Sequence, residues 1–278
     1  MSIKFEDFLI KFNNLIDDNL TGTTDATGNA GGTTLIDSAL KKYDDGYFGD
    51  PGRDTEWWVY VESQLRSIKK SISATGTINV HKAFTAQIAS SKAYALHRFN
   101  RDKKKAAINQ ALNQAYPWFY ARVEDATTLD GTGASVNKYT VPVTFTEFPT
   151  EIWKIHIADT KYTRTQITDY ETEEIGGARY FYANITEGDD ILLIGKTYLS
   201  QFTTDTSTTE LSDSQADVVV LLAASILYRN LSGFVNAADS GRFDSLANRY
   251  EAMYEAKKIG ASMPVLTSGK LDWSWLND

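Results

Sequence analysis

The chain has 278 residues, of which 42% are hydrophobic, and 28 basic against 36 acidic residues give a net charge of −8. A chain of this mass buries roughly 70–75% of the surface that its unfolded form exposes, which allows one large or two modest domains. The acidic balance argues against sequence-independent coating of DNA through a broad basic face. Because there is no cysteine, disulfides and thiolate metal sites are excluded.

The N-terminus has no features of a secretory signal, because Glu6 and Asp7 interrupt its apolar residues. The longest apolar run, Val218–Ala224, is far shorter than the roughly 20 residues that span a bilayer. We therefore expect no membrane insertion. The chain should act in the compartment where it is made, or in a particle assembled there.

The first segment, residues 1–20, is predicted to form an amphipathic helix. Phe5, Phe8 and Phe12 fall at helical spacing on one face, and Glu6 and Asp7 suit the positive end of the helix dipole. Residues 21–34 are polar and glycine-rich without periodicity, which predicts a flexible loop.

Residues 35–100 form a first predicted β block. The segments TEWWVYVES, GTINVHKAF and SKAYALHRF contain alternating side chains and, between them, turn-forming residues. A helix is then predicted within residues 101–123, where Ile108, Ala111 and Leu112 share a buried stripe from residue 107 onward. Pro117 is expected to end or kink this helix.

Residues 124–203 form a second predicted β block. EIWKIHI alternates Trp153 and Ile155 with Lys154 and His156, and RYFYANI and DILLIGKTYL follow after turn signals.

The C-terminal third, residues 204–260, is predicted to contain two helices. Ser212 and Gln215 form a capping box before a helix that is apolar nearly all round, and this helix should be the most buried element. Residues 261–278 have no helical period and are expected to form an extended tail.

The order of these elements predicts an α+β fold. Strands do not alternate singly with helices, which excludes a doubly wound parallel sheet. We expect about four helices in one bundle, with two strand-rich antiparallel β insertions and an extended C-terminal tail.

The motifs of common catalytic sites are missing from the sequence. It contains no phosphate-binding glycine motif and no G-x-S-x-G nucleophile elbow. His81, His97 and His156 have no H-E-x-x-H context, so a surface or hydrogen-bonded histidine is the favoured interpretation. We expect neither an enzyme nor a bound cofactor or metal.

The segment YDDGYFGDPGRD gathers four aspartates, Asp44, Asp45, Asp50 and Asp54. Hard cations need several oxygen ligands, so a calcium loop is one interpretation. The spacing does not match an EF-hand, and a turn rich in glycine and aspartate is the favoured one. The sequence alone leaves calcium binding open.

The segment RDKKKA, residues 101–106, is the one basic cluster in the sequence. It could contact nucleic-acid phosphates, but positive charge is unfavourable at the start of a helix. A solvated connector is the favoured interpretation.

Aromatic residues suggest two kinds of surface. Two aromatic groups occur in the body of the chain, the pair Trp57–Trp58 and the segment YPWFY at residues 116–120. They could stack on sugars or bases, but packing in the core is the favoured interpretation. In the tail, Trp273 and Trp275 lie in a stretch too short to fold alone, and tryptophan is a common interface anchor.

Three segments in this order, GYFGDPGRDTEWWVYVES, SIKKSISATGTINVHKAF and AINQALNQAYPWFYARV, resemble the head-to-tail adaptor (connector or neck) proteins of tailed bacteriophages. The resemblance covers about residues 33–260. It lies in the order and general pattern of the segments and not in a specific motif. The polar loop and the tail have no counterpart in the family.

The resemblance implies a structural protein of the virion neck, present in the host cytoplasm before assembly. Such a protein forms a ring, commonly of twelve copies, below the portal protein; it extends the DNA channel and offers a surface to tail or neck proteins. DNA would pass through without specific binding. We expect Leu271, Trp273, Trp275 and Leu276 to anchor the partner contacts.

A different class of function is a carbohydrate- or ligand-binding β module of a virion or surface protein. In that case Trp57, Trp58 or Trp153 would act as a stacking platform. An enzyme such as a glycosidase ranks last, because nothing in the sequence points to a substrate.

Overall fold

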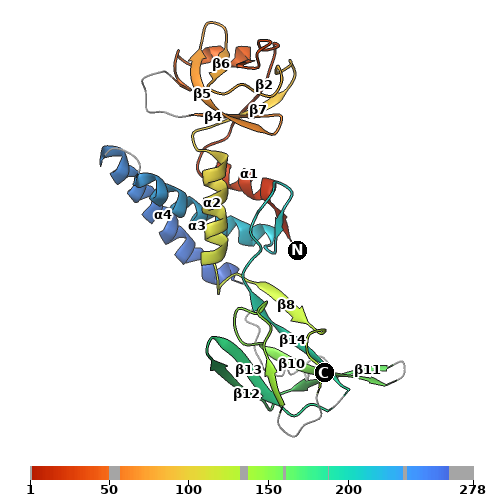
Figure 1. Cartoon of the computed structure of the whole chain (residues 1–278). Helices are drawn as coiled ribbons and strands as arrows, with labels where there is room; N and C mark the ends of the chain where they lie inside the picture. Colours follow the sequence, from red (N-terminus) through yellow and green to blue (C-terminus); the bar gives the residue numbers. More distant parts are fainter. Residues whose placement is uncertain are drawn as a thin grey trace, which may run out of the picture. The chain divides into compact units, whose positions relative to one another are not determined.

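The computed structural model describes residues 2–49, 57–131, 137–158, 161–186, 188–233 and 237–262. The chain divides into two compact units (Figure 1). Unit 1 consists of residues 1–114 and 201–258, and unit 2 is built on residues 115–200. Within the described ranges, no helix combines the length and the apolar character that crossing a bilayer requires.

The prediction of a helix bundle with two β insertions is wrong. Of the described residues, 31% are helical and 31% are strand, and the strands form four antiparallel sheets beside four helices. Several strands, such as LTGT and TLI in unit 1, are too short or too polar to show an alternation of apolar and polar side chains. They exist because distant segments pair with them, and a local pattern does not contain that information.

Unit 1 contains a six-stranded antiparallel sheet in the order β2-β7-β4-β5-β6-β3. Its strands are β2 (Leu20–Thr23), β3 (Thr34–Ile36), β4 (Trp58–Val61), β5 (Gln64–Ile72), β6 (Thr77–Val80) and β7 (Ala93–His97), with a 3-10 helix at Ser38–Lys42. Its core includes Leu35, Val59, Ile78 and Leu96, each fully buried.

The predicted loop 21–34 is partly strand. Residues 20–23 pair with β7, and residues 34–36 pair with β6. Between them the backbone is fixed by hydrogen bonds, such as those from the N–H of Gly28 to the carbonyl of Ile88 and from the N–H of Thr24 to the carbonyl of Lys92. Polar composition predicted flexibility, but the polar groups here bond to neighbouring segments.

The four helices of unit 1 are α1 (Phe5–Leu15), α2 (Arg101–Gln114), α3 (Asp213–Ser232) and α4 (Ala237–Ala261). Helix α3 packs against both α1 and α2, and it is buried along most of its length, as predicted. The predicted capping box of Ser212 and Gln215 is present at its start. A short two-stranded sheet pairs β1 (Ile3–Lys4) with β15 (Thr208–Thr209).

Helix α2 lies within its predicted range, residues 101–123, but it ends earlier than predicted. It begins at Arg101, so the basic segment is helical, and it ends at Gln114, before Pro117. The chain then enters strand β8 (Ala121–Asp125), inside the range that the pattern assigned to a helix. Proline cannot continue the helical hydrogen-bond ladder, which explains the early end.

Unit 2 packs two antiparallel sheets around one core. The four-stranded sheet has the order β11-β10-β14-β8, and the three-stranded sheet has the order β12-β13-β9. Their remaining strands are β9 (Asn137–Thr140), β10 (Glu151–Ala158), β11 (Lys161–Ile167), β12 (Glu171–Ile175), β13 (Ala178–Ala183) and β14 (Asp190–Thr197). Both sheets contribute to the shared core, which includes Tyr139, Phe181, Ile152 and Leu193.

Candidate functional site

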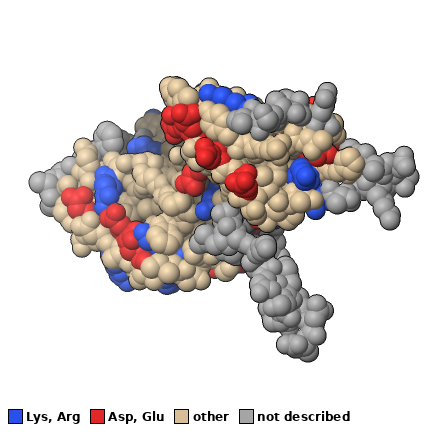
Figure 2. Space-filling view, turned by 90° about the horizontal axis from the view of Figure 1, so that it is seen from below, with Lys and Arg blue, Asp and Glu red and all other residues tan. Residues whose placement is uncertain are grey.

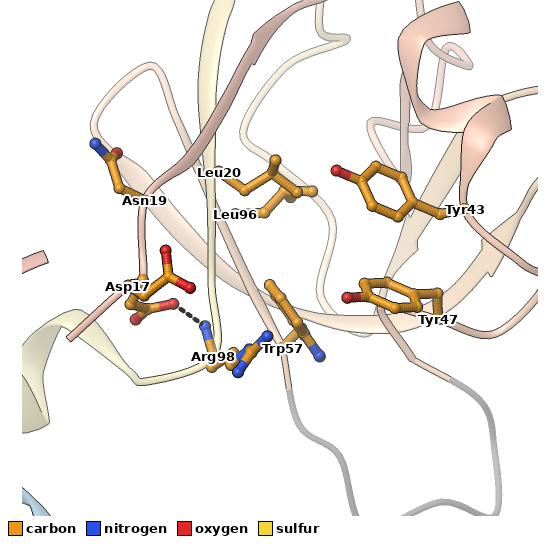
Figure 3. Close-up of a pocket in the computed structure, with 9 residues that line it drawn as sticks. Asp17, Asn19, Leu20, Tyr43, Tyr47, Trp57, Leu96 and Arg98 are labelled. Atoms are coloured by element: carbon orange, nitrogen blue, oxygen red, sulfur yellow. Dashed lines mark hydrogen bonds between the residues drawn. The ribbon is translucent and has the colours of Figure 1, made fainter. Parts of the chain in front are cut away.

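Among the described residues, we take an aromatic pocket in unit 1 as the candidate ligand-binding site (Figure 3). It is a partly open hollow of about 160 Å³ lined by Asp17, Asp18, Asn19, Leu20, Tyr43, Tyr47, Trp57, Leu96 and Arg98. In Figure 3 the hydroxyl groups of Tyr43 and Tyr47 point toward its centre, and Asp17 lies across from them.

Ring packing builds the aromatic wall of this pocket. The Tyr43 and Tyr47 rings stack with centroids 5.0 Å apart, and the Trp57 and Phe48 rings meet edge to face at 5.1 Å. Phe48 is almost fully buried, whereas Tyr47 is 43% exposed. The wall is therefore anchored in the core and reaches solvent at the pocket.

A cation lies beside the wall. The guanidinium of Arg98 lies 5.3 Å from the centroid of the Trp57 ring, within the range of a cation–π contact. The opposite wall offers the carboxylate of Asp17 and the amide of Asn19. Aromatic faces beside a few polar groups suit a small ligand that has one apolar face and several hydroxyl or amide groups.

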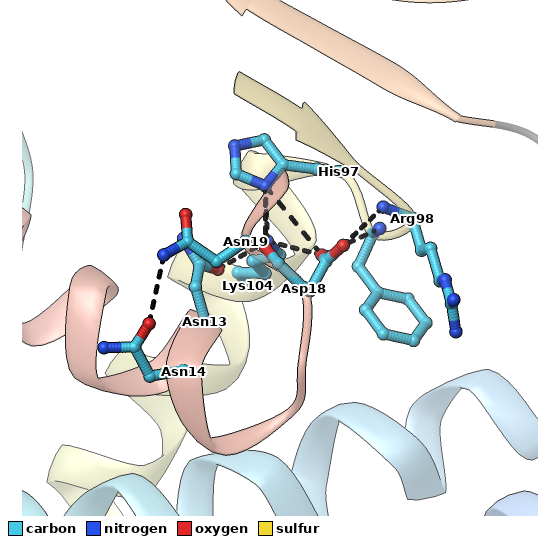
Figure 4. A network of polar contacts seen from close by, with 8 residues as sticks. Asn13, Asn14, Asp18, Asn19, His97, Arg98 and Lys104 are labelled. Carbon is cyan, nitrogen blue, oxygen red and sulfur yellow. Dashed lines mark hydrogen bonds and ion pairs between the residues drawn. The ribbon is translucent and has the colours of Figure 1, made fainter. Parts of the chain in front are cut away.

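A buried polar network fixes the floor of the pocket (Figure 4). The carboxylate of Asp18 accepts hydrogen bonds from the backbone N–H groups of Arg98 and Phe99, at 2.6 and 3.2 Å. The Lys104 ammonium lies 2.7 Å from the same carboxylate, and both side chains are only 1% exposed. The network therefore ties the turn after α1 to the end of β7 and to α2.

His97 and Asn13 complete the network. Lys104 donates to the side-chain oxygen of Asn13 at 2.6 Å and lies 3.3 Å from Nδ1 of His97, which is also 3.1 Å from the backbone oxygen of Asp18. Burial, and then the positive charge of Lys104, lowers the pKa of His97 to about 4. Burial also lowers the pKa of Lys104. The imidazole is therefore neutral at pH 7.

The basic segment is not the solvated connector that its sequence suggested. Arg101 is buried, pairs with Glu6 and with Asp205 at 3.2 Å, and lies 4.5 Å from the Tyr60 ring centroid. Lys104 belongs to the buried network, and Lys105 donates to a backbone carbonyl. These three cations serve the fold, which weakens the interpretation of a phosphate-binding cluster. On the face shown in Figure 2, neither sign of charge forms one continuous patch.

The acidic segment is only partly described, because Asp50 and Asp54 lie outside the described residues. Asp45 accepts a hydrogen bond from the backbone N–H of Ser73 at 2.5 Å, and this bond is the main cause of its lowered pKa. No group of three or more His, Asp or Glu side chains that could hold a metal occurs in the part of the chain that the structure describes.

The structure separates the tryptophans of the stacking hypothesis. Trp57 lines the pocket, and Trp58 lies in β4, paired in register with Ser67 and His97. Trp153 belongs to β10 in unit 2, where its indole N–H donates to Glu151 at 2.9 Å. Only Trp57 of the three therefore belongs to the candidate pocket.

The four predicted anchors of the tail, Leu271, Trp273, Trp275 and Leu276, lie outside the described residues. Sequence reasoning missed Tyr43, Tyr47 and Arg98 in the pocket. It also missed the buried Lys104, although a signal existed. Lys104 stands three and four residues before Ala107 and Ile108, which places it on the apolar stripe of α2.

Comparisons with known proteins do not place the chain in a family. No protein-family model, no curated protein and no solved structure matches it.

Proposed function

We propose that the chain is a structural virion protein, a head-to-tail adaptor that forms a ring below the portal, extends the DNA channel and provides the surface for tail attachment. The observation that carries the proposal is strand β12. It lies at the edge of its sheet, and all five of its residues are exposed.

An exposed strand edge is a site for pairing with another chain, and monomeric proteins usually shield such edges. Its last residue, Ile175, is a large apolar residue that is 47% exposed. A subunit that repeats the same contact around a ring buries such edges against its neighbours. The sheets would then supply contacts between subunits and toward the phage tail. The last two helices and the C-terminal residues 261–278 would supply contacts to the portal.

The charge of the chain suits a DNA channel. The net charge of −8 repels phosphates, and Arg101, Lys104 and Lys105 are held by partners within the protein. A ring of such subunits would carry a net negative charge, so DNA would slide through without specific binding.

The test of this proposal is the number of copies per particle. Quantitative mass spectrometry of particles from the phage that encodes this chain should count it against the portal protein. Copies equal to the portal, or a simple multiple of it, support a ring at the neck. Absence from mature particles would refute the adaptor.

A second candidate function is a carbohydrate- or ligand-binding module, and the aromatic pocket favours it. Its Trp57 and Tyr47 faces beside Arg98 and Asp17 could hold one sugar ring or a ligand of similar chemistry. A glycan array with the whole chain tests this. Binding that disappears in Trp57→Ala and persists in the control Trp153→Ala supports it, and no binding to any glycan counts against it.

A further inference from the structure

Strand β12 is an acidic edge that projects beyond its own core. Glu171, Glu173 and Glu174 supply three negative charges in five residues. Thr172 and Glu174 share the side of the sheet on which Phe181 is buried, because Thr172 pairs in register with Phe181. Both are nevertheless exposed. The strand therefore has two exposed faces and one open edge.

The hairpin that presents this edge is rigidly formed. Gly176 and Gly177 both have positive φ, at 61° and 82°, as a two-residue turn of the type I′ class requires. On the outer face, the Tyr182 hydroxyl donates to Glu173 at 2.5 Å, and the Lys138 ammonium lies 3.8 Å from the Tyr180 ring centroid. The edge is thus preorganised for pairing, and little further ordering would accompany it.

Strand β11 is an edge of opposite charge in the other sheet of unit 2. It carries Lys161 and Arg164 and no acidic residue. It is the end strand of the order β11-β10-β14-β8, and both Arg164 and Thr165 are exposed. Figure 1 shows β11 and β12 on opposite sides of unit 2.

We propose that β11 of one copy of this chain pairs edge to edge with β12 of the next copy. This inference rests on the proposed function, because it specifies the contact that closes the ring. Two different edges on opposite sides of one unit make a head-to-tail contact, which generates a ring when the rotation closes. The occupant of each edge is therefore a second copy of the chain.

Charge decides which edges meet. Two β12 strands would place three glutamates against three glutamates, and two β11 strands would place like cations together, both of which are unfavourable. Pairing β11 with β12 brings the basic strand, with its exposed Arg164, beside the glutamates instead. Opposite charges across strands stabilise a sheet, so charge selects the partner, and the backbone hydrogen bonds supply the rest of the affinity.

Cysteine cross-linking of the whole chain tests this contact, and the natural absence of cysteine removes background reaction. Thr172→Cys marks β12, and Thr165→Cys marks β11, both at exposed positions. A short bismaleimide should cross-link the two variants when they are mixed and should leave each variant alone uncross-linked. Thr127→Cys, which follows β8 at the other edge of the same sheet, is the matched control and should not cross-link to Thr172→Cys.

Charge exchange provides a second readout in the same assay. E171K/E174K makes both edges basic, and K161E/R164E makes both edges acidic, so either variant alone should lose self-association. Glu173 is left in place because it accepts the Tyr182 hydroxyl. A mixture of the two variants should associate again, in alternating order, and so should one chain that carries all four substitutions.

The outcomes separate this inference from the proposed function. A mixed cross-link together with rescue by charge exchange supports the edge contact. Rings without the mixed cross-link, or cross-linking of Thr172→Cys with itself, overturn the edge contact and leave the adaptor standing. A mixed cross-link in a chain that is absent from particles keeps the contact and removes the adaptor. No self-association and no cross-link at any concentration overturns the contact.

Discussion

Replacing Asp18 with asparagine removes one charge from the buried network and leaves the positive charge of Lys104 without its ionic partner. Asp18 is bonded to the Lys104 ammonium at 2.7 Å and to two backbone N–H groups, and neither charged side chain reaches solvent. Breaking a buried ion pair from one side costs about 3–5 kcal/mol, because the remaining charge has no water to replace its partner. We expect a loss of stability in that range for Asp18→Asn.

Two further variants make the magnitude interpretable. Glu62→Gln makes the same carboxylate-to-amide change in the exposed pair of Glu62 with Lys92, whose side chains are 35% and 44% exposed at a separation of 2.6 Å. It should cost at most about 1 kcal/mol. In the double variant D18N/K104M, no charge is left stranded, so it should be more stable than Asp18→Asn alone.

The assay is urea unfolding followed by circular dichroism at the helical signal. Helices α1, α2 and α3 lie wholly in unit 1, and so does nearly all of α4, so this signal reports on the unit that contains the network. The reasoning is refuted if Asp18→Asn costs no more than Glu62→Gln. It is also refuted if the double variant is less stable than Asp18→Asn.

Three other predictions concern different parts of the chain. His97 has a pKa of about 6.5 in the unfolded chain and about 4 in the folded one, so the unfolded chain binds a proton first as the pH falls. The free energy of unfolding should therefore fall by about 3 kcal/mol between these two pH values. His97→Gln should flatten that part of the stability–pH curve, and an unchanged slope would contradict the assignment. Leu221→Ala in α3, where the side chain is 2% exposed, should cost about 2–5 kcal/mol in urea unfolding. The exposed control Asn230→Ala should stay within about 0.5 kcal/mol of the wild type. Deleting residues 271–278 should abolish docking to the portal in a binding assay and leave circular dichroism unchanged, and intact docking would remove the tail from the mechanism.

Several elements were predictable because their signals are local. The phenylalanine spacing of α1 and the capping box and apolar run of α3 each specify a helix within one segment, and the structure confirms them. The strand patterns around Trp58 and Trp153 are likewise present as β4 and β10. Period and capping depend on neighbours in sequence, so the sequence contains them.

The start of α2 shows where local reasoning failed. Positive charge is unfavourable in the first turn of a helix, and a solvated segment was expected there, yet Arg101 and Lys104 are buried. Their cost is offset by Glu6, Asp205 and Asp18, which lie far away in sequence. A buried cation is stable only beside its partner, and no window of sequence contains both.

What the sequence alone determined was the set of locally encoded elements: α1 and α3, the main strand segments and the absence of cysteine chemistry. Only the tertiary structure decided how the strands pair into four sheets, that Trp57 meets Tyr47 and Arg98 in one pocket, and that β11 and β12 are left as edges of opposite charge. The physical reason is the same in each case. Pairing and burial are contacts between distant segments, whereas periodicity records only which face of one segment is apolar.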